Sequence, residues 1–118
     1  MRRLGFTCAL AFALGASETA LAHAIVLSST PRADQTIRGE ELAIEIRFNS
    51  RIDAARSHMK LFKIGGDAVA LPILDAASTD TLNAKATGLE PGAYRLHWQA
   101  LSLDGHITQG DISFVVSR

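Results

Sequence analysis

Hydrophobic and polar residues alternate along several stretches of the chain. The stretch LAIEIRF (residues 42–48) places its leucine, isoleucines and phenylalanine on one side, and its alanine, glutamate and arginine on the other. The stretches YRLHW (94–98) and DISFVV (111–116) repeat this period of two. Because successive side chains of a β-strand point to opposite faces, the alternation predicts strands that are buried on one face and exposed on the other.

The rest of the chain adds weaker strand signals between turn signals. Four further strands are expected at 24–28, 58–64, 68–71 and 81–86, separated by turn-forming stretches such as TPRAD, IGGD and LEPGAY. Seven short strands with turns about every ten residues predict an all-β fold, a two-layer β-sandwich of immunoglobulin-like type. In LEPGAY, Tyr94 is expected to pack inward and to hydrogen-bond back to the loop. A helix over 53–61 is the competing prediction, but its apolar spacing is poor.

The first 22 residues have the three-part pattern of a secretory signal peptide. Arg2 and Arg3 are followed by an apolar run over 4–16 and by the small-residue sequence ALA at 20–22. A membrane anchor is the alternative, but an apolar run of about a dozen residues is shorter than the roughly 20 that span a bilayer. We therefore expect a signal peptide over 1–22, cleaved after Ala22, and a single exported domain over 23–118.

Charge and cysteine content narrow the function classes of the expected mature domain. The whole chain has twelve basic and twelve acidic residues, and removal of Arg2, Arg3 and Glu18 leaves ten basic and eleven acidic ones. A nearly neutral balance without a basic patch gives no support for nucleic-acid binding. Cys8, the only cysteine, lies in the apolar run, so the mature domain is expected to have neither a disulfide nor a thiolate metal site. No later stretch is long and apolar enough for membrane insertion.

Cleavage after Ala22 would make His23 the amino-terminal residue, which changes its chemistry. The free α-amine and the ring Nδ1 of an N-terminal histidine can bind one metal ion together. The amine has an ordinary pKa of about 7.7–8.0, so a metal can displace its proton at neutral pH. A second imidazole would complete three nitrogens in a T, an arrangement that suits the tetragonal preference of Cu(II).

The stretch SLDGHITQG (102–110) contains Asp104 and His106, two positions apart. In extended backbone such residues point to the same side, so a carboxylate and an imidazole can converge on one ion, and Gly105 between them permits a tight bend. The alternative is an ordinary aspartate–glycine hairpin turn with a solvated His106. A histidine at the expected mature terminus is an independent feature, and the two together favour a metal site made of His23, Asp104 and His106.

Two further histidines are weaker candidates. His97 faces away from the aromatic side of its strand and is expected on the surface. His58 next to Met59 has the composition of a soft-metal ligand pair. Met59 shares a strand face with Leu61, however, so we expect Met59 in the core.

Three segments together resemble the CopC family of periplasmic copper-binding proteins. They are HAIVLSSTPRAD, IRFNSRID and LEPGAYRLHWQALSLDGHITQGDISFVV, and they cover nearly all of the chain after residue 22. The resemblance implies a small β-sandwich of cupredoxin or immunoglobulin-like appearance, with a Cu(II) site of the histidine-brace type whose ligands match His23, Asp104 and His106. It also implies a periplasmic copper carrier or buffer in copper homeostasis or resistance, with a CopD-type membrane copper importer as partner.

The sequence departs from the family pattern at three places. Met59 is the only methionine after Met1, so the methionine-rich Cu(I) site of some members is not expected. Ser50 stands where some members have an acid next to the copper ligands. The sequence therefore does not predict which side chain would support the terminal amine. Ile25 stands where many members have a histidine, which removes a competing square-planar site.

These observations predict a monomer that binds one Cu(II), holds no tight Cu(I) and is not an enzyme. A histidine brace also serves copper oxygenases that cleave polysaccharides, but here the domain is small and Asp104 would occupy a position that oxygen activation needs open. A further alternative is an immunoglobulin-like interaction module without metal, which would require the histidines to be accidental.

Overall fold

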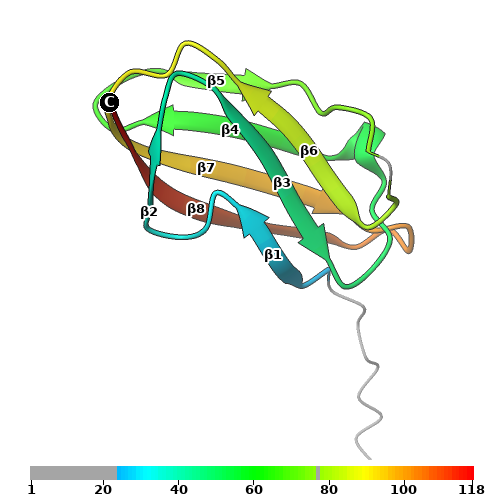
Figure 1. Ribbon diagram of the computed structural model, residues 1–118. Helices are drawn as coiled ribbons and strands as arrows, with labels where there is room; N and C mark the ends of the chain where they lie inside the picture. Colours follow the sequence, from blue (N-terminus) through cyan, green and yellow to red (C-terminus); the bar gives the residue numbers. More distant parts are fainter. Residues whose placement is uncertain (1–23, 77) are drawn as a thin grey trace, which may run out of the picture.

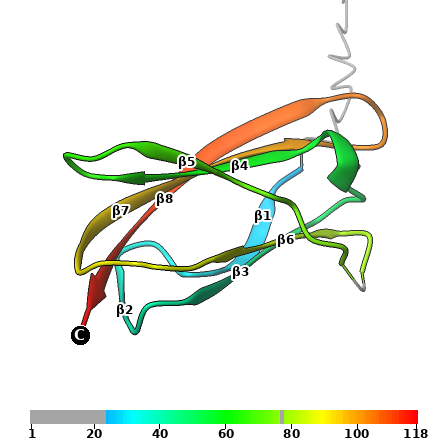
Figure 2. The same cartoon turned by 90° about the horizontal axis from the view of Figure 1, so that it is seen from above.

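The computed structural model describes residues 24–76 and 78–118, which form two β-sheets packed face to face (Figures 1 and 2). This arrangement confirms the predicted all-β sandwich. The elements in chain order are β1 (Val26–Thr30), β2 (Gln35–Arg38), β3 (Leu42–Phe48), the 3₁₀ turn η1 (Ala54–Arg56), β4 (His58–Lys63), β5 (Ala68–Leu71), β6 (Thr81–Ala86), β7 (Gly92–Leu101) and β8 (Ile107–Ser117).

One sheet has three strands and the other has five. The smaller sheet has the order β1-β3-β6, and both of its pairings are antiparallel. The larger sheet has the order β2-β8-β7-β4-β5, in which only β2 pairs in parallel, with β8. The long β7–β8 hairpin, with register pairs from Gly92↔Val116 to Leu101↔Ile107, forms the centre of the larger sheet and carries the Asp104–His106 stretch at its tip.

The core lies between the two sheets and follows the predicted alternation. In β3 every second residue is buried, from Leu42 to Phe48. Phe48 of the smaller sheet meets Trp98 of the larger sheet edge-to-face, with ring centroids 5.2 Å apart and an interplanar angle of 68°. Aromatic pairs in this geometry stabilise a core beyond their area of burial. The buried inner faces therefore hold the sheets together through apolar packing.

The predicted corner at LEPGAY is confirmed. The Tyr94 hydroxyl donates to the carbonyl oxygen of Glu90 at 2.8 Å and accepts the Glu90 N–H at 3.0 Å. The Tyr94 ring is buried and stacks on Phe114 at 5.5 Å between centroids. One side chain thus satisfies both backbone groups of a loop residue and fixes the entry to β7.

The structure differs from the sequence-based prediction mainly in its set of strands. Residues 24–76 and 78–118 form eight strands, because the sequence pattern missed β2, a four-residue edge strand with the single apolar residue Ile37 and therefore no alternation to detect. β1 covers Val26–Thr30 rather than 24–28, and β4 ends at Lys63 rather than at residue 64. The disfavoured helix over 53–61 does not form, because η1 is limited to Ala54–Arg56 and His58 begins the predicted strand β4. Within residues 24–76 and 78–118, no helix is both long and apolar enough to cross a membrane.

Candidate metal centre

The loop between β7 and β8 is a tight turn that holds the two predicted ligands of the described chain. The Ser102 N–H donates to the carbonyl of His106 at 2.9 Å, and the Gly105 N–H donates to the carbonyl of Ser102 at 2.9 Å. Gly105 has a φ of 89°, a backbone conformation that favours glycine because a side chain would be strained there. The sequence DGH therefore folds into a turn that places Asp104 and His106 on either side of a glycine.

The structure brings the Asp104 and His106 side chains into direct contact. Asp104 Oδ2 lies 3.1 Å from His106 Nδ1, and Asp104 Oδ1 accepts the His106 backbone N–H at 3.1 Å. The side chains are 41% and 43% exposed, respectively, although the His106 Nδ1 atom itself is covered. The pair thus lies at the surface and is held by its own turn.

Ser102 supports this turn with a buried side chain, a role that the sequence-based prediction did not assign. Its side chain is buried, its hydroxyl donates to Asp104 Oδ1, and its Oγ also lies 3.0 Å from the carbonyl oxygen of His106. The signal was present in the sequence, because a serine or aspartate near a turn commonly bonds the backbone or side chain two residues away. Ser102 is therefore the buried support of an exposed ligand pair.

The electrostatic consequence is a strongly acidic Asp104. The hydrogen bond from Ser102 lowers its pKa most, followed by the His106 backbone N–H and the His106 side chain, and together they bring the pKa to about 2. Each of these contacts favours the charged form of the carboxyl group. Asp104 is consequently a carboxylate at neutral pH, and a carboxylate beside an imidazole is a donor pair for a divalent metal.

The third predicted ligand, His23, lies outside the described residues. Within them, no group of three or more histidine, cysteine, aspartate or glutamate side chains could hold a metal ion. The chain is described from Ala24 onward, and Ala24 itself is buried in the core.

One short segment after β3, residues 49–53, contacts both the start of the described chain and the β7–β8 loop. Asn49 binds Ile25 twice: the Ile25 N–H donates to Asn49 Oδ1 at 2.8 Å, and the Asn49 N–H donates to the Ile25 carbonyl at 3.0 Å. The Leu103 N–H donates to the Arg51 carbonyl at 3.2 Å. Both views show the beginning of β1, the end of β3 and the β7–β8 loop at the same end of the sandwich (Figures 1 and 2).

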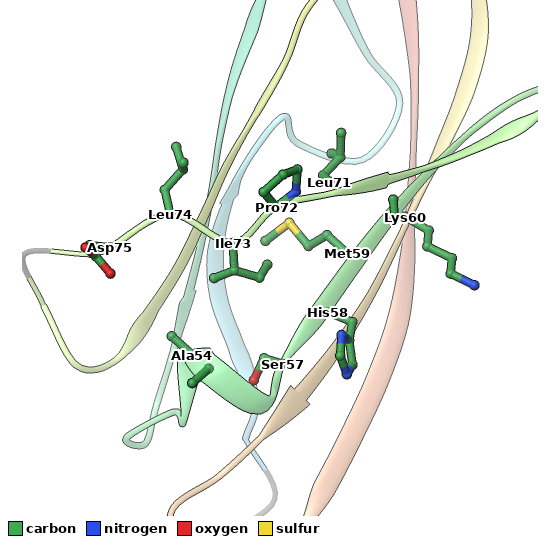
Figure 3. A pocket seen from close by; sticks show the side chains of 12 residues that line it. Ala54, Ser57, His58, Met59, Lys60, Leu71, Pro72, Ile73, Leu74 and Asp75 are labelled. Atoms are coloured by element: carbon green, nitrogen blue, oxygen red, sulfur yellow. The ribbon is translucent and has the colours of Figure 1, made fainter.

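The other sequence-level candidates do not join this site. His97 lies on the outer face of the larger sheet, with Nδ1 2.9 Å from Asp111 Oδ1 across the β7–β8 pairing. Met59 is only 1% exposed, which confirms that it is a core residue. Met59 lines a cavity of about 380 Å³ between β4 and the segment after β5, where its side chain points toward Pro72, whereas the side chain of His58, which also lines this cavity, points away from that of Met59 (Figure 3). The thioether and the imidazole therefore do not form a ligand pair.

Ser50 stands where the resemblance implies an acid in some members of the family. Its Oγ is buried and has no hydrogen-bond partner among residues 24–76 and 78–118. Ser50 lies next to Asn49, which holds Ile25, so this hydroxyl is close in sequence to the segment that carries the chain start.

Comparison with known proteins relates the chain to copper proteins. The family model for the CopC domain matches residues 26–117. Copper resistance protein C of Escherichia coli is 29% identical over 112 residues, covering 87% of this chain and 88% of that protein. Copper resistance protein C of Xanthomonas campestris pv. juglandis is 27% identical over 123 residues, with 98% and 96% covered. The copper transport protein CutJ of Bacillus subtilis is 26% identical over 92% of this chain, which spans only 21% of that longer protein.

Solved structures agree with the sequence matches. CopC from Methylosinus trichosporium OB3b superposes with a TM-score of 0.74 at 25% identity, covering 80% of this chain and 94% of that one. PcoC, a methionine-rich copper resistance protein from Escherichia coli, superposes with a TM-score of 0.69 at 25% identity, covering 81% and 100%. The chain therefore belongs to the CopC domain family of copper resistance proteins, a family of copper-binding carriers and not of enzymes.

Proposed function

We propose that the mature protein is a periplasmic Cu(II) carrier or buffer that binds one ion per monomer in a histidine brace. The ligands are the α-amine and Nδ1 of His23, the imidazole of His106 and the carboxylate of Asp104. The observation that carries this proposal is the exposed Asp104–His106 pair, with 3.1 Å between carboxylate and imidazole, at the end of the sandwich where the described chain begins.

The position of Ile25 supports a role for His23. Two hydrogen bonds to Asn49 fix the Ile25 backbone, and Ala24 is buried. His23 precedes Ile25 by two residues, which span at most about 7 Å even in extended chain. The segment that holds Ile25 also holds Leu103 of the β7–β8 loop, and this shared support is the reason for proposing that the amine of His23 reaches the loop.

The donor atoms support Cu(II) rather than Cu(I). Amine, imidazole and carboxylate donors suit the divalent ion, whereas a tight Cu(I) site needs soft thioether or thiolate donors. PcoC is described as methionine rich, but Met59 is the only methionine here after Met1, and it is buried. We therefore propose that this protein has no tight Cu(I) site.

The cellular setting follows from the first 22 residues and from the relatives. We propose export with cleavage after Ala22, because His23 gains its amine only by that cut. In Bacillus subtilis, a segment similar to this chain makes up about a fifth of a protein named for copper transport. A CopD-type membrane copper importer is accordingly the proposed partner of this domain, which we propose to be a monomer.

A change of a single residue at the amino terminus tests the proposal. Protein exported from the full chain, with His23 confirmed as its first residue by mass spectrometry, is compared with protein that retains one additional residue before His23. The extension keeps the imidazole but converts the amine to an amide, so most of the chelate gain should be lost. Equal Cu(II) affinities in competition titrations would contradict the brace.

Substitutions in the loop give an independent test. His106→Ala should weaken Cu(II) binding more than Asp104→Asn, because imidazole is an equatorial donor while the carboxylate adds charge compensation through a longer bond. Both variants should keep the fold, since neither side chain is buried. An equal and large loss of thermal stability in both copper-free variants would mean that the pair is structural.

A further inference from the structure

We infer that Asn49 is a positioning residue for the copper site: its side chain fixes the chain immediately after the amino terminus, and so presents the terminal amine to the β7–β8 loop. This inference rests on the proposed function. Asn49 itself is not a ligand, because its Oδ1 already accepts the Ile25 N–H at 2.8 Å. Its effect on copper is exerted through Ile25.

The contacts of Asn49 form a two-point clamp. The side-chain oxygen takes the Ile25 N–H, while the Asn49 backbone N–H donates to the Ile25 carbonyl at 3.0 Å. The regular β1–β3 pairing begins only at Val26↔Phe48 and is interrupted there by a bulge between Val26 and Ser28. The two hydrogen bonds between Asn49 and Ile25 therefore continue the β1–β3 pairing by one residue toward the amino terminus, beyond the bulge.

The same segment anchors the other half of the site. The Arg51 carbonyl accepts the Leu103 N–H at 3.2 Å, Ile52 forms an isolated bridge with Ser102, and the Asp53 N–H donates to the Leu101 carbonyl at 2.8 Å. These contacts hold residues 101–103, the side of the turn that leads from β7 into Asp104. Residues 49–53 thus set the distance between the chain start and the copper loop.

This connection should affect copper affinity through preorganisation. If Ile25 is already fixed in the copper-free protein, binding need not order it. Each backbone residue that must be ordered on binding lowers an affinity by about tenfold. Rigidity of this kind strengthens binding without a new contact to the ligand.

The clamp should also determine which nitrogen atoms copper binds. Cu(II) anchored at a terminal amine can displace protons from the following backbone amides, release them to the buffer and bind the amide nitrogens. The Ile25 N–H is engaged by Asn49 Oδ1, which opposes this mode at the third mature residue. Loss of the clamp should therefore shift binding from the brace toward backbone amides.

The test compares three variants exported from the full chain, each with His23 verified as its first residue. Asn49→Ala removes the side-chain acceptor, and Asn49→Asp keeps an acceptor oxygen at the same place. Gln35→Ala is the matched control, because Gln35 Oε1 accepts the Arg32 N–H at 2.9 Å, also an exposed carboxamide bond to backbone, on β2 at the other end of the sandwich (Figure 1).

Competition titration with Cu(II), together with visible and electron paramagnetic resonance spectra, gives the readouts. Asn49→Ala should lose about threefold to tenfold in Cu(II) affinity, the equivalent of one hydrogen bond, and its d–d band should move to shorter wavelength with more protons released per copper. Asn49→Asp should restore wild-type affinity and spectrum, and Gln35→Ala should change neither.

Two results would overturn the inference. One is wild-type affinity and spectrum in Asn49→Ala while the one-residue extension before His23 still abolishes tight binding; this leaves the proposed function intact. The other is an equal loss of affinity in Asn49→Ala and Gln35→Ala, which would reflect general destabilisation. If the extended wild-type protein binds as tightly as the native one, the proposed function fails, and the inference with it.

Discussion

Replacement of Ser102 by alanine should raise the pKa of Asp104 and weaken Cu(II) binding at the proposed site without unfolding the loop. Ser102 is buried, and its hydroxyl donates to Asp104 Oδ1. The backbone of the turn does not depend on this hydroxyl, because the Ser102 N–H donates to the His106 carbonyl at 2.9 Å. Ser102→Ala therefore separates the electrostatic support of the carboxylate from the shape of the loop.

The size of the expected pKa change follows from the contacts that lower the pKa of Asp104. The Ser102 hydrogen bond is the largest of the contacts that lower the pKa of Asp104 from 3.8 to about 2. In Ser102→Ala, the His106 backbone N–H and side chain remain. The pKa should consequently rise toward 3.8 without reaching it. At pH 7 Asp104 is ionised in both proteins, so any loss of Cu(II) affinity there reflects a less well oriented carboxylate and not proton competition.

The same shift fixes the pH dependence of stability. The native pKa of Asp104 lies below its unfolded value, so the native state gains stability from ionisation above pH 3.8 and loses it as the pH falls toward about 2. Wild type should therefore exceed Ser102→Ala in thermal stability at pH 5 and above. This difference in thermal stability should shrink as the pH falls from 3.8 toward about 2.

The assay is a ¹³C NMR titration of the Asp104 carboxyl group in copper-free protein, with thermal unfolding followed from pH 2 to 7. Ser78→Ala is a matched control, because the Ser78 hydroxyl donates to Asp80 and is the largest cause that lowers the pKa of that residue. It should move the titration of Asp80 and leave Asp104 and Cu(II) binding unchanged. A pKa of about 2 for Asp104 in Ser102→Ala would refute the reasoning.

Three further predictions concern the fold and the Cu(I) question. Gly110→Ala should destabilise the domain by about 1–3 kcal/mol in urea unfolding, because an added Cβ would lie 2.8 Å from Trp98 Cζ2 and overpack it; unchanged stability would show that the ring can shift freely. Tyr94→Phe should cost about 1–3 kcal/mol by the same measurement, since it leaves both backbone groups of Glu90 without their hydroxyl partner. Met59→Leu should cost less than about 1.5 kcal/mol and leave weak Cu(I) binding unchanged in a chelator competition, and a loss of Cu(I) would identify Met59 as a ligand.

Most of the fold could be predicted because the core uses one simple pattern. The boundaries of β3, β5 and β6 match the prediction, and in β3 the inward residues are those that alternate in the sequence. β2 could not be predicted in this way, because it is short, lies at a sheet edge and pairs in parallel with β8, a strand far away in sequence. Such a pairing depends on tertiary contacts that a local pattern does not encode.

The candidate site was predictable in its chemistry but only in part in its supports. Asp104 and His106 have the right donor types at a spacing that signals convergence, and the structure places them in contact. The contribution of Ser102 is local, since its hydroxyl bonds Asp104 two positions away, and the turn pattern could have indicated it. The contribution of Asn49 depends on where the chain folds back, because Asn49 bonds a residue 24 positions away, and it becomes recognisable only when that partner is known.

The division between core and loop predicts that this domain stays folded without its metal. The inner faces of both sheets are closed by apolar residues such as Phe48, Leu96 and Phe114, none more than 1% exposed, whereas Asp104 and His106 lie outside this packing. Their removal leaves no buried charge and no cavity, so it should not compromise the core. Copper in turn should stabilise the folded state only by mass action, in proportion to the logarithm of its concentration over its dissociation constant. A carrier that must load and unload its ion benefits from this arrangement, because the domain should stay folded when copper dissociates.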